Sequence, residues 1–323
     1  PAIIGMLPMP GGALFSAPMV NDMDRELNVD PLLKSKINYW FRHIWEYWWP
    51  LYPGVLLALD MTGLSPGKFI MLQFGLSFFA IGAGYFVFLK KIPESQNEET
   101  SWNIRNILQM PLLIAPVLTI IAVYSVITIF IPGAAEISGY LPMIAGVTIA
   151  IFTVILQRSP DIKMLAEIVT SRNTLKLILL VAVIGIYGAF IETPLPDGTF
   201  IMGHVREELT GNNIPVIFII MLIPIISGLS TGIAVGFVGA SFPIVMNLLG
   251  PAPALSDVMS YTVIAYSFGF AGMMLSPVHV CHVVTVKYFN SSLNRSSLAM
   301  IIPTLFIMAG GLFISLIIAV FLK

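Results

Sequence analysis

The chain is poor in charge and in cysteine. Only 10% of its 323 residues are Asp, Glu, Lys or Arg, whereas about 25% is usual for a soluble globular domain. The net formal charge of −1 favours no nucleic-acid partner, and the single Cys281 excludes an intramolecular disulfide framework. Hydrophobic residues make up 57% of the chain, and its mean hydropathy is +0.90. The sequence therefore predicts an all-α polytopic membrane protein that interacts with the lipid bilayer.

Motifs of the common enzyme and cofactor sites are also missing. The sequence has no nucleotide-binding glycine loop, no paired metal-ligand motif and no serine triad pattern. We therefore expect no enzyme activity, no cofactor and no metal. The chain opens on Pro1 without a charged signal-peptide start, so we expect it to begin inside a larger protein.

Uninterrupted apolar runs predict ordinary membrane spans. They cover 68–89, 108–131, 139–157, 174–192 and 297–322. Two further runs, 48–64 and 258–288, are broken by a proline, which lacks an N–H and clashes with the preceding turn. The limbs of 214–250 are short, and residues 1–20 hold four prolines and three glycines. We interpret these two segments as re-entrant hairpins, the first with its other limb upstream.

The basic residues test this topology. Counting one crossing per span and none per hairpin places 13 of the 16 Lys and Arg on one side, which the positive-inside rule assigns to the cytoplasm. Trp40, Trp45, Trp48 and Trp49 are interpreted as a belt at the headgroup level rather than a cofactor box. The predicted cytoplasmic loops are 21–47, 90–106, 158–174 and 288–296, and the predicted location is the cytoplasmic (inner) membrane of a prokaryote.

Short matches indicate an internal repeat. Ser16-Ala-Pro18-Met-Val20 matches Ser241-Phe-Pro243-Ile-Val245 at a shift of 225, and Leu51-Tyr-Pro53 matches Leu275-Ser-Pro277 at a shift of 224. The first broken span and the four spans after it make five crossings, so the second broken span would run in the opposite direction. The two halves would therefore be inverted, as in many secondary transporters. We predict that residues 1–131 hold the C-terminal part of the first repeat plus linking spans. Residues 132–323 would hold the second repeat, with the hairpin 214–250 and the broken helix 258–288.

Three stretches resemble a known family. They are Leu7–Pro18, Asn38–Pro53 and Leu275–Cys281, and they are similar to the uncharacterised bacterial and archaeal membrane family called domain of unknown function 401. That family is grouped with the ion transporter superfamily of gluconate, citrate and dicarboxylate carriers. The resemblance implies two re-entrant hairpins, two broken helices, cation or proton coupling, and a homodimer. A Ser-Asn-Thr triplet at the hairpin tips is the signature of the sodium–dicarboxylate branch of that superfamily. This chain has no such triplet at either tip, which weighs against sodium as the coupling ion and a dicarboxylate as the solute.

Polar residues at the breaks and hairpin tips are the candidate substrate and ion ligands. Free N–H groups and hydroxyls at such tips attract anions, although small residues there also serve close helix packing. His279 and His282 share a face and suit proton coupling, with a structural histidine as the alternative. Asp60 is either an intramembrane site or an interfacial carboxylate. The candidates are Ser227, Gly228, Ser230, Thr231, Gly232, Ser276, Pro277, His279, His282, Pro10, Gly11, Gly12, Tyr52, Pro53 and Asp60.

These features predict a secondary active transporter. Its partners would be a small anionic solute of the carboxylate type and a coupling proton or other cation. Two alternatives stay open. One is an intramembrane enzyme that uses His279 and His282 with Asp60 or Ser276. The other is a passive channel lined by both broken helices. For the transporter, we expect both breaks to meet, with the tip Ser227–Gly232 and the stretch Pro8–Gly12 facing them.

Overall fold

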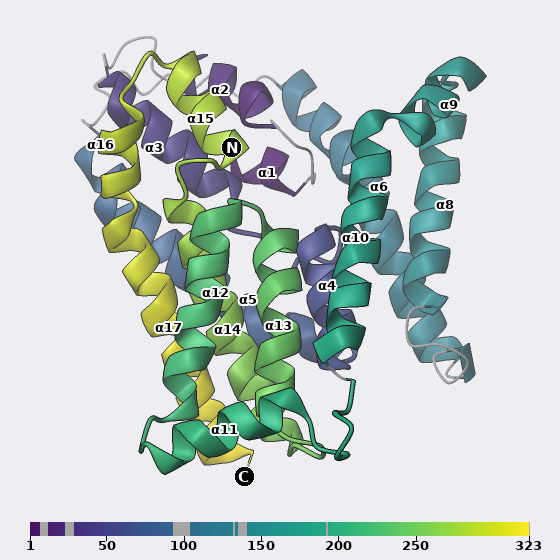
Figure 1. The fold of residues 1–323 in the computed structure, drawn as a ribbon. Coiled ribbons are helices and arrows are strands. Elements are labelled where there is room, and N and C mark those ends of the chain that lie inside the picture. Colours follow the sequence, from purple (N-terminus) through teal and green to yellow (C-terminus); the bar gives the residue numbers. More distant parts are fainter. Residues whose placement is uncertain are drawn as a thin grey trace. The chain divides into compact units, whose positions relative to one another are not determined.

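The computed structural model describes residues 1–6, 12–22, 29–92, 104–131, 133–134, 141–191 and 193–322. Within them every regular element is a helix (Figure 1). The chain forms two compact units, unit 1 with Pro1–Ser95 and Val181–Lys323, and unit 2 with Gln96–Leu180. This division follows packing and does not test the predicted boundary between 131 and 132, which stays a prediction.

Unit 1 is built on a helical hairpin packed against a broken helix. The hairpin consists of α12 (Val216–Thr231) and α13 (Ala234–Leu248), as the short limbs of 214–250 predicted. α12 lies along α14 (Leu255–Leu275), and a Cβ on Gly228 or Gly272 would overlap the main chain of the other helix. Glycine is therefore required for this close approach, which is the packing role considered for Gly228. α11 (Ile201–Gly211) lies crosswise at one end of the hairpin (Figure 1).

The helix after the hairpin is interrupted where the sequence places Ser276-Pro277. α14 ends at Leu275 and α15 (Val280–Tyr288) begins after an extended His279. Pro277 cannot donate to the helical ladder, so the chain leaves the helix here. α16 (Leu293–Ala299) and α17 (Ile301–Phe321) follow. The predicted cytoplasmic loop 288–296 is thus helical from Leu293 onward.

The amino-terminal part of unit 1 holds short helices and one long one. They are α1 (Ala2–Gly5), α2 (Ala13–Asp22), α3 (Pro31–Arg42), α4 (Pro53–Thr62), α5 (Pro66–Val87) and the 3₁₀ turn η1 (Leu89–Lys91). α3 begins at Asp30, whose carboxylate accepts a hydrogen bond from Leu32 N, and Pro31 occupies the first helical position. At 10 residues, α4 is about 15 Å long, too short to cross a bilayer alone.

The prediction of a loop over 21–47 is wrong for α3. Its lysines suggested a headgroup-level segment, but its second half is buried in unit 1. There Asn38 Nδ2 donates to the Ala13 carbonyl at 3.2 Å and to Thr285 Oγ1 at 3.1 Å. Because these partners lie far away in the sequence, composition could not show that polar side chains here would be satisfied internally.

The prediction of a tryptophan belt is also wrong for Trp40 and Trp49, which are 1% and 3% exposed. Their indole nitrogens donate to main-chain carbonyls, Trp40 to Ala80 at 2.8 Å and Trp49 to Met6 at 2.9 Å. Trp40 thereby joins α3 to α5, and Trp49 binds a carbonyl that the end of α1 leaves without a helical partner. The aromatic segment closes a protein interior.

Unit 2 contains α6 (Ile104–Phe130), α8 (Leu141–Arg158) and α9 (Ile162–Thr170), and α10 (Arg172–Ile191) begins in it and ends in unit 1. α6 packs against α8, where a Cβ on Gly146 would lie 3.0 Å from the Ile120 carbonyl oxygen. The predicted loop 158–174 contains α9, so it is largely helical. The described part of the predicted loop 90–106 includes the end of η1 and the start of α6.

Four helical segments in the described residues are long and apolar enough to cross a membrane. They are Pro66–Lys91, Ile162–Ile191, Leu255–Tyr288 and Leu293–Phe321. α4, α12 and α13 are apolar but shorter. The chain is therefore a helical membrane protein, as the hydropathy predicted.

Candidate functional site

The tip of the α12–α13 hairpin lies against the break between α14 and α15. Gly232 ends α12 in the left-handed conformation, with φ of 64°. A Cβ at this position would lie 3.0 Å from both His279 N and Ser276 Oγ. Ser276 Oγ donates to the Leu229 carbonyl at 2.7 Å and accepts from Val278 N at 3.3 Å. The hydroxyl thus satisfies main-chain groups that the end of α12 and the break leave without helical partners.

A tyrosine from α3 completes the break. With Val278 N bound to Ser276 Oγ, the Met274 carbonyl lacks its helical partner. Tyr39 Oη donates to that carbonyl at 3.0 Å, and Tyr39 is fully buried. α3 is therefore part of the site, although the sequence placed it in a loop.

Three imidazoles surround the Tyr39 ring. His282 stacks on it with the ring centroids 4.2 Å apart, and His43 and His279 meet it edge-on at 5.0 and 5.3 Å. His43 Nε2 is 3.1 Å from His279 Nε2, so one of these nitrogens donates to the other. His282 Nε2 is 2.8 Å from Ser296 Oγ at the start of the last span. His279 and His282 thus lie in one buried cluster.

The first break reaches the same hairpin tip. Gly54, in the first turn of α4, packs so closely on Ala234 that a Cβ there would lie 2.6 Å from the Ala234 Cβ. Ala234 begins α13 two residues after Gly232, which touches the second break. Pro53 opens α4, and the hydroxyl of Tyr52 donates to the Gly5 carbonyl at the end of α1. Both breaks therefore contact one segment, 232–235.

Other predicted residues lie around this cluster or outside it. Ser227 is half-buried, and Ser230 and Thr231 are exposed, with both hydroxyls bonded to carbonyls of their own helix. Pro277 is exposed beside the buried Ser276. Asp60 is exposed near the end of α4, seven residues beyond Pro53, so it does not join the break. Gly12 is buried before α2, whereas Pro10 and Gly11 lie outside the described residues.

Three residues at the candidate site were not among the predicted site residues: Tyr39, His43 and Glu46. These residues are spaced four and three apart, the spacing that places side chains on one helical face. His43 Nδ1 lies 2.6 Å from the Tyr39 carbonyl, and His43 Nε2 lies 3.8 Å from Glu46 Oε1. That spacing was the available signal, and the nearby lysines and tryptophans obscured it.

Several buried polar atoms near the breaks have no hydrogen-bond partner within the part of the chain that the structure describes. They include Nδ1 of His279 and of His282, and Oδ1 of Asn38. Leaving such a group unpaired costs about 1–3 kcal/mol. In an otherwise apolar interior, a concentration of such atoms indicates a place where a polar ligand, an ion or water would be stabilised. The only described group of three metal-ligating side chains, His43, His279 and Cys281, lies in the same cluster.

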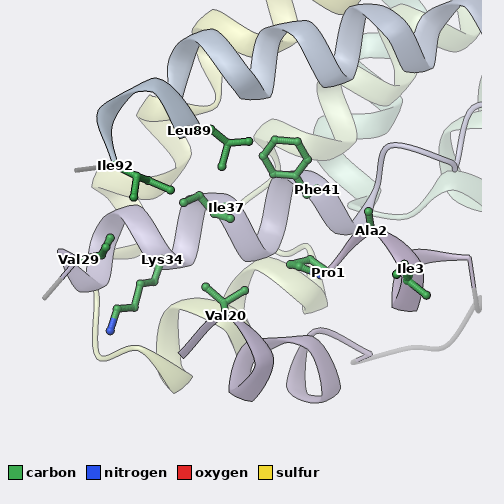
Figure 2. A pocket seen from close by; sticks show the side chains of 10 residues that line it. All are labelled: Pro1, Ala2, Ile3, Val20, Val29, Lys34, Ile37, Phe41, Leu89 and Ile92. Carbon is green, nitrogen blue, oxygen red and sulfur yellow. The ribbon is translucent and has the colours of Figure 1, made fainter. Parts of the chain in front are cut away.

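A separate apolar pocket of about 380 Å³ lies beside α1, α2 and α3 (Figure 2). Val20, Ile37, Phe41 and Leu89 are among its lining residues. Lys34 also lines it, but Lys34 Nζ donates to Asn21 Oδ1 at 3.3 Å. The described lining of the pocket is mostly apolar, whereas the breaks gather several buried polar side chains, so the polar cluster at the breaks is the candidate site.

Comparison with known proteins supplies a family without an activity. A comparison with curated proteins finds no significant match. The family model described as "Protein of unknown function (DUF401)" matches residues 1–319, nearly the whole chain. The helical membrane protein with this buried cluster of tyrosine and histidines therefore belongs to the DUF401 family.

Proposed function

We propose that the protein is a secondary active transporter, which moves a small anionic solute of the carboxylate type in exchange or symport with protons or another cation. The observation that carries the proposal is the meeting of two interrupted helices at one hairpin tip, among buried polar side chains. Irregular backbone at membrane depth is tolerated where protein or a wet cavity satisfies it, and transporters hold substrates at such breaks.

The proposed architecture is an inverted repeat. α2 and α13 each carry a proline inside the helix, Pro18 and Pro243, which correspond at the 225-residue shift. Two residues before each proline is a fully buried serine whose hydroxyl bonds to the preceding turn of its own helix. At the related shift of 224, α3 corresponds to α14 and α4 corresponds to α15, so each pair would form one of the two broken spans. In this interpretation α3 belongs to the membrane domain, which accounts for its burial.

A buried guanidinium supports an anionic substrate. Arg42 is 1% exposed at the end of α3, adjacent to His43, and donates to the Ile4 carbonyl at 3.3 Å. The predicted topology placed Arg42 in the loop 21–47, and the predicted anion ligands were free N–H groups and hydroxyls at the hairpin tips. Arg42 adds a fixed positive charge to the same interior, and arginine suits carboxylate recognition because its planar donors match two carboxylate oxygens.

The paired imidazoles support proton coupling. His43 and His279 come from α3 and from the second break, and a single hydrogen bond joins them. Moving one break relative to the other would separate these nitrogens and change the partner of the shared proton. Histidine is the side chain whose ordinary pKa lies closest to neutrality, so it can exchange protons under physiological conditions.

The remaining parts of the proposal are a homodimer in the cytoplasmic membrane of a prokaryote, as the family resemblance implies.

Uptake by proteoliposomes tests the proposal. Full-length protein would be reconstituted and screened with labelled sugar acids and dicarboxylates, with and without an imposed pH gradient. We expect at least one carboxylate to accumulate against its gradient, and His279→Gln to lose the dependence on the pH gradient. His204→Gln, on the exposed face of α11, is the matched control. Downhill flux alone, insensitive to any ion gradient, would favour the passive channel and refute active transport.

A further inference from the structure

A second chemical feature of the cluster is a set of three buried donor atoms. His43 Nε2 and His279 Nε2 are 3.1 Å apart, and Cys281 Sγ lies within 4.8 Å of one ring nitrogen of each histidine. The three residues are 1%, 6% and 8% exposed. The spacing of His279 and Cys281 would separate their side chains on a continuous helix. His279 is instead extended before the first turn of α15, which allows both side chains to approach His43.

The distances match a small tetrahedral cation. Zinc binds imidazole nitrogen at about 2.0–2.1 Å and thiolate at about 2.3 Å, so tetrahedral geometry separates two ligating nitrogens by about 3.3 Å and nitrogen from sulfur by about 3.6 Å. The two imidazole nitrogens already stand near that separation. The Cys281 sulfur, which lies within 4.8 Å, has to move closer by up to about 1.2 Å.

The hydrogen bonding of His43 orients it as a metal ligand. Its Nδ1 is 2.6 Å from the Tyr39 carbonyl. A carbonyl oxygen only accepts hydrogen bonds, so His43 Nδ1 carries the proton and His43 Nε2 presents its lone pair to His279. Imidazoles that bind metals characteristically donate their other N–H to a carbonyl or carboxylate, which fixes the ring and its tautomer.

The surrounding charges also favour a divalent cation. Cys281 would bind as a thiolate, releasing its proton, and Glu46 Oε1 lies 3.8 Å from His43 Nε2. These two negative charges would offset the charge of a divalent ion only in part, because the Arg42 guanidinium is buried in the same interior. The nearby positive charge is Arg42, whose side chain donates to the Ile4 carbonyl. Two imidazoles and one thiolate select borderline to soft transition cations over magnesium or calcium, which prefer oxygen ligands.

We propose that His43, His279 and Cys281 form a binding site for a divalent transition cation of the Zn²⁺ type, with the Glu46 carboxylate beside it. The site joins α3 to the break before α15, so an occupied site would hold these two elements together. This inference rests on the ligand geometry and does not depend on transport. The uptake assay tests transport and the cobalt titration tests the metal site, so failure of one proposal can be told apart from failure of the other.

Cobalt binding to the full chain tests the site directly. The protein would be purified in detergent without a polyhistidine tag, stripped with a chelator and titrated with Co²⁺. We expect saturation near one ion per chain, with a thiolate-to-cobalt charge-transfer band that Zn²⁺ abolishes by displacement. Cys281→Ser should lose this band. His43→Gln should weaken Co²⁺ binding at least about 10-fold, and His204→Gln, the same change on the exposed face of α11, should leave it unchanged.

A test on the unaltered protein covers the case in which these variants misfold. Zn²⁺ should slow the reaction of Cys281, the one cysteine in the chain, with a thiol reagent. Absence of saturable Co²⁺ binding by the wild-type chain would overturn the proposal. So would an unchanged Cys281 reaction rate at saturating Zn²⁺, or Co²⁺ binding that responds to His204→Gln and not to His43→Gln.

Discussion

Replacement of Tyr39 by phenylalanine isolates the contribution of one hydrogen bond to the broken helix. The Tyr39 hydroxyl donates at 3.0 Å to the Met274 carbonyl, in the last turn of α14. The helical partner of that carbonyl would be Val278 N, which instead donates to Ser276 Oγ. Tyr39→Phe therefore leaves the Met274 carbonyl without this partner in a buried environment.

The expected loss of stability follows from the chemistry of that carbonyl. An unpaired buried acceptor costs about 1–3 kcal/mol. The aromatic ring is retained, so its stacking on His282 at 4.2 Å and its apolar contacts should persist. Each kcal/mol shifts the midpoint of thermal unfolding by about 2–4 °C in chains of 150–250 residues, and a longer chain shifts less. We therefore expect a decrease of a few degrees.

Thermal unfolding in detergent at a fixed scan rate measures this shift. The matched control is Tyr85→Phe, because Tyr85 is 52% exposed on α5 and contacts only a neighbouring aromatic ring among the described interactions. We expect Tyr85→Phe to unfold within about 1 °C of the wild type, in line with the small effects of surface substitutions. If Tyr39→Phe unfolds at the same temperature as Tyr85→Phe, the break does not depend on the tyrosine hydroxyl and the reasoning fails.

Three further predictions concern the glycines and His279. Gly272→Ala should lower the unfolding temperature, because the added Cβ would meet a carbonyl of α12. Gly82→Ala is the control, because a Cβ there meets open space, and it should be neutral or stabilising by up to about 1 kcal/mol. Equal shifts in unfolding temperature for the two variants would disprove close packing at Gly272. Gly232→Ala should destabilise more than Gly63→Ala, since both have φ of 64° but only Gly232 faces the break; the difference in unfolding temperature measures the contact, and no difference would exclude it. His279→Ala should abolish pH-driven uptake while the fold stays intact, because the variant loses the imidazole that shares a hydrogen bond with His43; undiminished pH-dependent uptake would limit His279 to packing.

Proline and glycine predicted the local interruptions of this fold correctly. The break at Ser276-Pro277 was predictable because proline cannot donate to the helical ladder, although Pro18 and Pro243 stand inside continuous helices. The turn at Gly232 was predictable because glycine adopts a positive φ without strain. Hydropathy likewise indicated a membrane protein from composition alone, and the four long apolar helices bear this out. The inverted repeat and the sidedness of the loops stay predictions.

The interior partners of α3 could not be predicted in the same way. Lys34 and Lys36 beside several tryptophans are typical of a membrane interface, and the sequence holds no local sign that Trp49 would bind the Met6 carbonyl. A polar or aromatic side chain can be buried only when its partner group is in place, and that partner is brought by distant chain.

The candidate site shows the same distinction between local and tertiary information. That His279 and His282 follow a broken helix could be predicted from the sequence, since both features are set within a few residues. The packing of separate helices brings His43, 236 residues away from His279, into a shared hydrogen bond with it. It also decided that Asp60 would lie outside the cluster, because the direction of α4 carries it away from the break. Local covalent geometry fixes where a helix stops, whereas the groups that fill the gap depend on how separate helices pack.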